Sequence, residues 1–160
     1  PITTPYFKFY ELEALCKMGE YPTVLAQMES YWGGMLREGA TTFWEEYDPT
    51  LTGVEQCAMY DQPFDKSFCH AWGASPVYLL GRYFLGVEPT KVGYAEFQVR
   101  PQLGGLAAMG GTVPLPDGKS VTVQVEGARV EVVTDAESGT LVLGERRFPI
   151  VPGQPLTVEG

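Results

Sequence analysis

Acidic and aromatic side chains are concentrated in residues 39–50, GATTFWEEYDPT. The acidic residues of this stretch are Glu45, Glu46 and Asp48. A carboxylate beside aromatic rings and other negative charges can have its pKa raised towards neutrality, and it can then act as a general base. The stretch therefore indicates a catalytic carboxylate on a loop, with Glu45 next to Trp44 as the candidate.

The same residues fit a structural alternative. Thr42 and Glu45 have the spacing of a capping box, in which a Ser or Thr begins a helix and a Glu three residues later reaches back to the cap. A helix that began here would end at once, because Asp48 precedes a proline and Gly53 soon follows. The spacing alone leaves open whether Glu45 is catalytic or structural.

His70, the only histidine, also allows two interpretations. It lies in the first turn of a helix predicted to begin near Ser67. As a structural residue it would form hydrogen bonds while facing a core of Trp72, Val77 and Leu80. As a functional residue it would be a neutral donor or acceptor for a ligand hydroxyl.

The cysteines do not extend this candidate site. Cys16, Cys57 and Cys69 contain no C-x-x-C pair, so neither a zinc knuckle nor a disulfide framework is indicated, and we expect free thiols. Cys69 and His70 are neighbours whose side chains point about 100° apart on a helix, which argues against Cys–His nucleophilic catalysis. These residues therefore predict no metal site.

Helices are predicted in the first part of the chain, where apolar residues recur at helical spacing up to about position 85. The predicted helices are residues 5–18, 22–37 and about 67–85. Thr4 and Pro5 are typical of a helix start. Gly33 and Gly34 weaken the second helix by about 1 kcal/mol each relative to Ala, and Pro76 predicts a kink in the third.

Strands are predicted beyond Val92, where apolar residues alternate along the chain. The predicted strands are residues 121–125, 129–135 and 139–144, and Gly-containing turns separate them. This pattern predicts an antiparallel sheet or a small sandwich that forms a separate module. Residues 86–92, GVEPTKV, are the predicted linker.

The composition limits the possible partners. The 160 residues carry a formal net charge of −9 without clustered Lys or Arg, which argues against binding to nucleic acid. An apolar fraction of 44% can build the core of one domain, or of a small domain and part of another. No run approaches the roughly 18 apolar residues that cross a membrane, so we expect a soluble protein, with its compartment open.

Aromatic residues are concentrated in the helical part, and only Tyr94, Phe97 and Phe148 follow Phe84. Sugar-binding sites favour aromatic rings together with carboxylates, because a ring covers the apolar face of a pyranose while polar groups bind its hydroxyls. Helix packing uses large side chains as well, so the composition alone does not decide between the two explanations.

The order of several motifs is more specific. A strand-rich tail follows three segments, in this order: TPYFKFYELEAL, SYWGGMLREGATTFWEEYDP and SFCHAWGASPVYLLGRYFLGVEPTKVGYAEFQVRPQLGGL. This order resembles the C-terminal end of bacterial α-L-rhamnosidases, an inverting glycoside hydrolase family, over nearly the whole chain. The resemblance implies α and β structure in separate modules: the last helices of an (α/α)6 barrel in residues 1–88 and an antiparallel β-sandwich in residues 89–160.

The resemblance also implies roles for individual residues. The family's proposed general base is the Glu that directly follows the Trp of the G-A-T-T-x-W-E motif, which is Glu45 here. Trp44 would shape the sugar pocket, and His70 would bind the substrate. The family usually has Arg or another residue where this sequence has Glu46, so Glu46 stays an alternative base. His70 lies in Cys-His-Ala instead of the frequent Asn-His-Tyr, which leaves the substrate preference open.

The resemblance places the general acid far upstream, in helices that these residues do not include. The expected partners are therefore a rhamnosylated glycoside and the N-terminal part of the parent enzyme, and we expect the fragment to be inactive alone. The first helix is apolar almost all round, which predicts self-association. The alternative function is a non-catalytic carbohydrate-binding or structural accessory module.

Overall fold

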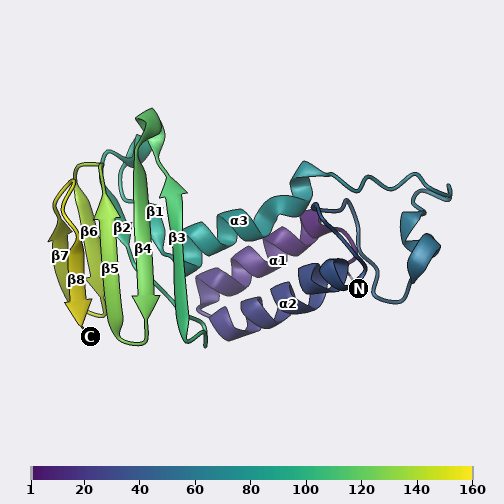
Figure 1. The fold of residues 1–160 in the computed structure, drawn as a ribbon, viewed down its shortest axis with the longest axis horizontal. Coiled ribbons are helices and arrows are strands. Elements are labelled where there is room, and N and C mark those ends of the chain that lie inside the picture. The colour runs from purple at the N-terminus through teal and green to yellow at the C-terminus, as the bar shows by residue number, and fades with distance from the viewer. Residues whose placement is uncertain (1, 160) are drawn as a thin grey trace. The chain divides into compact units, whose positions relative to one another are not determined.

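The computed structural model describes residues 2–159, which form two compact units with a boundary between Tyr78 and Leu79. The first unit contains helices and long loops, and the second contains the eight strands found among residues 2–159 (Figure 1). None of the helices in residues 2–159 is long and apolar enough to cross a bilayer. The expected α + β class is therefore confirmed for the described residues.

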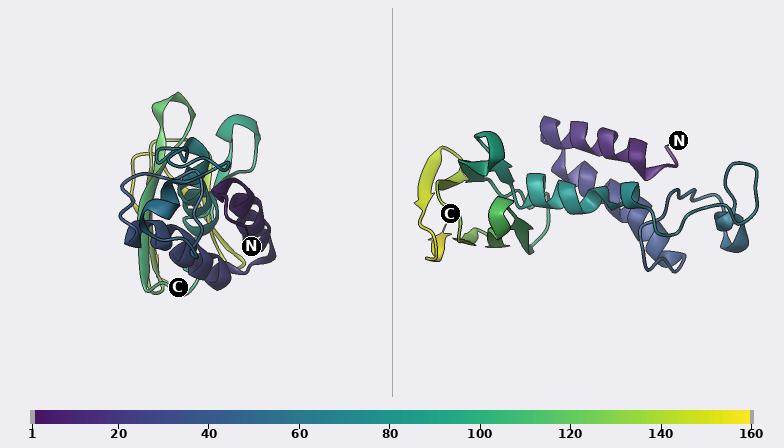
Figure 2. Two further views of the ribbon diagram at one scale, coloured as in Figure 1. Left: turned by 90° about the vertical axis from the view of Figure 1, so that its right-hand side faces the viewer. Right: turned by 90° about the horizontal axis from the view of Figure 1, so that it is seen from above.

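The first unit opens with the predicted helical hairpin, α1 (Pro5–Met18) and α2 (Tyr21–Arg37). The α1 helix begins after the extended Thr4 and ends at Gly19, whose φ of 83° closes the turn. Figure 2 shows the two helices side by side. Their facing sides supply the buried residues of this unit's helical core, including Leu12, Cys16, Val24 and Met28.

The third helix begins later than predicted. Residues 67–70 are not helical, and His70 is extended, with φ −125° and ψ 120°. A 3-10 turn, Ala71–Ala74, leads into the short helix α3 (Ser75–Leu79). Pro76 therefore lies in the first turn of α3, where its missing N–H breaks no helical hydrogen bond, and the predicted mid-helix kink is wrong.

The second unit begins with a π-helical turn, Leu80–Phe84, and continues into two four-stranded sheets. The first sheet has the order β1-β2-β6-β7 and comprises β1 (Val87–Pro89), β2 (Phe97–Val99), β6 (Gly139–Leu143) and β7 (Arg146–Ile150). The second has the order β3-β4-β5-β8 and comprises β3 (Ala108–Pro114), β4 (Ser120–Glu126), β5 (Arg129–Thr134) and β8 (Leu156–Glu159). Neighbouring strands are antiparallel except β2 and β6, which are parallel.

Alternating apolar residues of the two sheets form one shared buried core. Its fully buried members include Phe97, Val99 and Leu141 from the first sheet and Val121, Val123 and Val132 from the second. The three predicted strands are confirmed as β4, β5 and β6. The prediction that residues 86–92 form a linker is wrong, because Val87–Pro89 pair with Phe97–Val99 in a sheet. The division into residues 1–88 and 89–160 stays a prediction.

Candidate active site

The carboxylate stretch is an extended segment fixed by a second segment of the same unit. The Glu45 amide donates to the Ser67 carbonyl at 2.9 Å, and the His70 amide donates to the Phe43 carbonyl at 2.8 Å. These two hydrogen bonds place residues 43–45 beside residues 67–70. Two stretches that are more than 20 positions apart in the sequence thus form one site.

The capping-box interpretation of Glu45 is wrong. Residues 42–45 are not helical, and the Thr42 hydroxyl donates to the Phe68 carbonyl instead of capping a helix. A reciprocal cap of this kind occurs later, where the Thr52 amide donates to the Glu55 carboxylate at 3.2 Å at the start of the 3-10 helix Gly53–Cys57. The Glu45 carboxylate is therefore free of helix capping.

Glu45 is buried, with 7% of its surface exposed, and neutral donors surround its carboxylate. Oε2 accepts the Ser67 amide at 3.0 Å, and Oε1 accepts the Tyr60 hydroxyl at 3.2 Å. The Nδ1 atom of His70 lies 3.7 Å from Oε2. The structure thus brings together two of the predicted site residues, Glu45 and His70.

His70 lies against Trp72, with 4.2 Å between the ring centroids. The Trp72 indole N–H donates to the Glu45 carbonyl at 3.2 Å, so this ring is tied to the same segment as the carboxylate. The imidazole keeps 27% of its side-chain surface exposed. A residue in this position is fixed on one side by aromatic packing and retains polar atoms for a neighbour or a ligand.

Trp44, the third predicted site residue, is buried, with 6% of its surface exposed. Its ring makes an edge-to-face contact with Phe68, with a centroid distance of 4.8 Å. This packing holds the Trp44 ring against the same segment, residues 67–70, that is hydrogen-bonded to residues 43–45. Direct contact between Trp44 and a sugar stays a prediction.

Glu46, the alternative base, has a different environment from Glu45. Its side chain is 22% exposed, and Oε2 lies 4.0 Å from the ammonium nitrogen of Lys66. It also lines a cavity of about 370 Å³ together with Thr4, Tyr6, Phe7, Met59, Tyr60 and Trp72. The two adjacent glutamates therefore differ in burial and in partners.

Tyr60 and Trp72 contact Glu45, although neither is a predicted site residue. Tyr60 has φ 52° and Asp61 has φ 60°, in a tight turn closed by two hydrogen bonds between Met59 and Gln62. Its hydrogen bond to the Glu45 carboxylate raises the pKa of the Tyr60 hydroxyl. No turn signal such as Asn-Gly marks this position, so only the three-dimensional contact identifies Tyr60.

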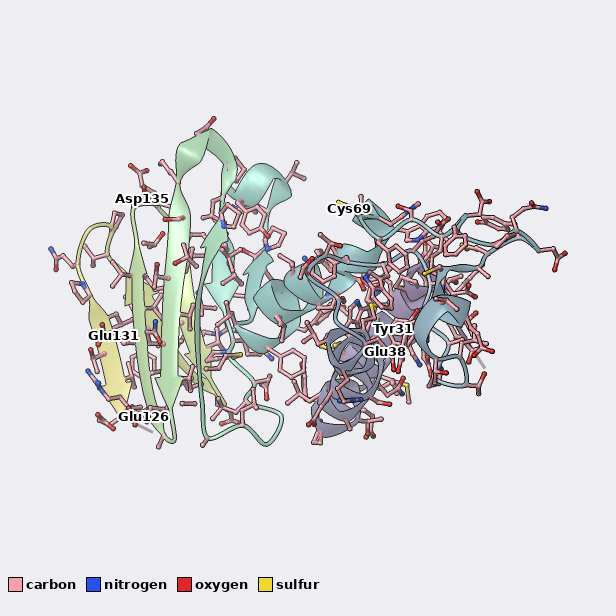
Figure 3. The ribbon with its side chains drawn as sticks, turned by 45° about the vertical axis from the view of Figure 1, so that its right-hand side comes forward. Tyr31, Glu38, Cys69, Glu126, Glu131 and Asp135 are labelled. Atoms are coloured by element: carbon pink, nitrogen blue, oxygen red, sulfur yellow. The ribbon has the colours of Figure 1, made fainter. Side chains whose placement is uncertain are left out.

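Cys69 is exposed next to this site, and Figure 3 shows its side chain at the surface. Cys16 is buried, and Cys57 is partly buried. Within residues 2–159, no three His, Cys, Asp or Glu side chains lie close enough together to hold a metal ion.

Comparisons with known proteins identify the family. Residues 7–84 match the family described as the bacterial α-L-rhamnosidase six-hairpin glycosidase domain. The crystal structure of a GH78 family rhamnosidase of Bacillus sp. GL1 matches 90% of this chain with a TM-score of 0.73 and 32% sequence identity, and this chain spans 15% of that protein's length. A comparison with curated proteins found no match. The chain belongs to the bacterial α-L-rhamnosidase family.

Proposed function

We propose that the chain is the C-terminal part of an inverting α-L-rhamnosidase, in which Glu45 is the general base. The observation that carries the proposal is the setting of the Glu45 carboxylate. It is buried, its hydrogen-bond donors are the Ser67 amide and the Tyr60 phenol, and no Lys or Arg of residues 2–159 forms an ion pair with it. A carboxylate in such a setting is held by neutral hydrogen-bond donors and has no Lys or Arg counterion, so it can accept a proton from water.

The proposed reaction is the hydrolysis of a terminal α-L-rhamnosyl group. Glu45 removes a proton from a water molecule as the water oxygen attacks the anomeric carbon, and a carboxylic acid protonates the departing glycosidic oxygen. The two carboxyl groups of an inverting enzyme lie about 6.5–9.5 Å apart, which leaves room for the water. The acid comes from the part of the parent enzyme that precedes these residues, so we expect the 160-residue chain alone to be inactive.

His70 and Trp44 have supporting roles in this proposal. His70 binds a sugar hydroxyl through its partly exposed imidazole, beside the Trp72 ring. Trp44 shapes the pocket through its packing against Phe68. The helices of the first unit are then the last helices of an (α/α)6 barrel, and the reaction requires no cofactor.

We assign a structural role to the strand-rich unit. Within residues 79–159 its aromatic residues are Tyr83, Phe84, Tyr94, Phe97 and Phe148, of which Tyr83, Phe84 and Phe97 are buried and Tyr94 and Phe148 are partly buried. A sugar platform requires an accessible ring, so these residues do not favour the alternative of a carbohydrate-binding module. Binding of rhamnose or a rhamnoside to this unit in isothermal titration calorimetry would contradict the assignment.

Two substitutions in the parent enzyme test the proposed base. Glu45→Gln and Glu46→Gln remove one carboxylate each and preserve the side-chain size. We expect kcat for an aryl α-L-rhamnoside to fall by about 10²-fold or more in Glu45→Gln only, with both variants folded. A loss of this size in Glu46→Gln instead, with Glu45→Gln active, would transfer the role to Glu46.

A further inference from the structure

Lys66 is a buried cation that the proposed reaction does not use. Its side chain is 0% exposed. Its ammonium lies 3.3 Å from the Gln56 side-chain oxygen and 4.0 Å from Oε2 of Glu46. Burial of a charge is unfavourable unless it is compensated by hydrogen bonds and by opposite charge. Burial accordingly lowers the pKa of Lys66, whereas the negative charge of Glu46 acts in the opposite direction.

Gln56 fixes the position of this ammonium. It is 2% exposed, and its amide nitrogen donates to the carbonyls of Asp48 at 2.7 Å and Leu51 at 3.0 Å. Its oxygen is thereby turned towards Lys66. The Lys66 amide also donates to the Cys57 carbonyl at 3.1 Å. These hydrogen bonds connect the two ends of the loop between Asp48 and Lys66, with the lysine side chain inside it.

Lys66 and Ser67 contact both glutamates of the candidate site. The Ser67 amide donates to the Glu45 carboxylate, and its carbonyl accepts the Glu45 amide. The ammonium of Lys66 points towards the Glu46 carboxylate. One dipeptide thus presents a neutral donor to the first glutamate and a positive charge to the second.

We propose that Lys66 is a positioning residue that gives the two adjacent glutamates different roles, an inference that rests on the proposed function. Its ammonium pairs with Glu46, which becomes a structural counterion. Its backbone fixes Ser67 and through it the Glu45 carboxylate, which is left with neutral donors and remains available as the base. The other acidic groups that act on Lys66 are Cys57, Asp48 and, most weakly, Glu45.

The pairing can be tested in the 160-residue chain without any enzyme activity. NMR titration of the Lys66 side chain would compare the wild type with Glu46→Gln and with the matched control Glu45→Gln. We expect Glu46→Gln to lower the pKa of Lys66 further, because it removes the nearest negative charge, and Glu45→Gln to lower it less. Equal shifts in both variants, or no shift in Glu46→Gln, would overturn the pairing.

The positioning role is tested in the parent enzyme with Lys66→Met, Lys66→Arg and Gln56→Met. Lys66→Met removes the charge at similar volume, and we expect kcat to fall about tenfold or more while KM stays within about twofold. Lys66→Arg should recover most of the rate because it restores the charge. Gln56→Met loosens the same loop without removing a charge, and we expect it to retain more activity than Lys66→Met.

Equal losses in Lys66→Met and Gln56→Met, or full activity in Lys66→Met, would overturn the positioning role. A different result would show that the proposed function itself is wrong. In that case Glu45→Gln keeps its activity in the parent enzyme, whereas the NMR titration still reports on the pairing of Lys66 and Glu46.

Discussion

Two identical side chains, Glu45 and Glu46, lie next to each other and have different surroundings. The Glu45 carboxylate accepts an amide and a phenol, whereas Glu46 lies near the buried ammonium of Lys66. Position in the chain cannot separate them, because both follow Trp44 within two residues. The two glutamates differ in their hydrogen-bond and charge partners, and the neutral donors at Glu45 support it as the proposed base.

The three thiols should differ in reactivity because alkylation requires the thiolate and access to it. Burial, with a smaller contribution from Glu13, raises the pKa of Cys16 to about 11. Cys69 is exposed. With iodoacetamide at about pH 8, we expect Cys69 to be labelled first and Cys16 to be protected until the chain unfolds. Peptide mass mapping over time measures the order, and early labelling of Cys16 in the folded chain would contradict it.

The sequence identified only part of the candidate site. The G-A-T-T-x-W-E motif led to Glu45, and the single histidine led to His70; the structure places their side chains 3.7 Å apart. Tyr60 and Lys66 were not predicted, because they reach the glutamates from a loop whose path depends on non-local hydrogen bonds and on left-handed residues. Residue spacing carries no information on such contacts.

Two neighbouring glycines in α2 provide a matched test of helix packing. A Cβ at Gly34 would lie 2.4–2.6 Å from ring carbons and the hydroxyl oxygen of Tyr47, whereas a Cβ at Gly33 would lie 3.4 Å from the flexible end of Arg37. We expect Gly33→Ala to raise the free energy of unfolding by up to about 1 kcal/mol through helix propensity. Gly34→Ala should lower it by about 1–3 kcal/mol, because the displaced Tyr47 is buried.

Urea unfolding of the 160-residue chain measures both variants. Equal stabilisation by the two substitutions would show that Tyr47 can move at little cost, and it would contradict the close packing of this ring against α2.

Elements with a strong local pattern were predicted well, and elements that depend on distant partners were not. The Pro-initiated and Gly-terminated α1 and the alternating β4 and β5 follow from local rules. Residues 67–70 were predicted as helix, but their backbone groups bond to residues 43–45 instead. The strand β1 was missed because it is three residues long and ends in Pro89, which an edge strand tolerates.

At the scale of the whole chain, an exposed aromatic patch on α1 predicts self-association. Its members are Tyr6, Phe7 and Tyr10, which are 42%, 59% and 50% exposed. An apolar surface of this kind favours burial against a second copy. We expect sedimentation over a concentration series to detect association, and Phe7→Glu to weaken it. Val92→Glu is the control, because Val92 is 97% exposed and lies outside the patch.

A monomer at every concentration would contradict this prediction. Equal weakening by Phe7→Glu and Val92→Glu would contradict it as well, because added charge would then explain the effect without any role for the patch.

Glu45 is the proposed activator of the attacking water, and one comparison tests this role most directly. In the parent enzyme, kcat of Glu45→Gln would be measured on an aryl α-L-rhamnoside and on α-L-rhamnosyl fluoride, whose leaving group requires no general acid. A missing base slows water attack on both substrates, so we expect a loss of about 10²-fold or more on each. Recovery of the wild-type rate on the fluoride would contradict it, because Glu45 would then be acting as the acid.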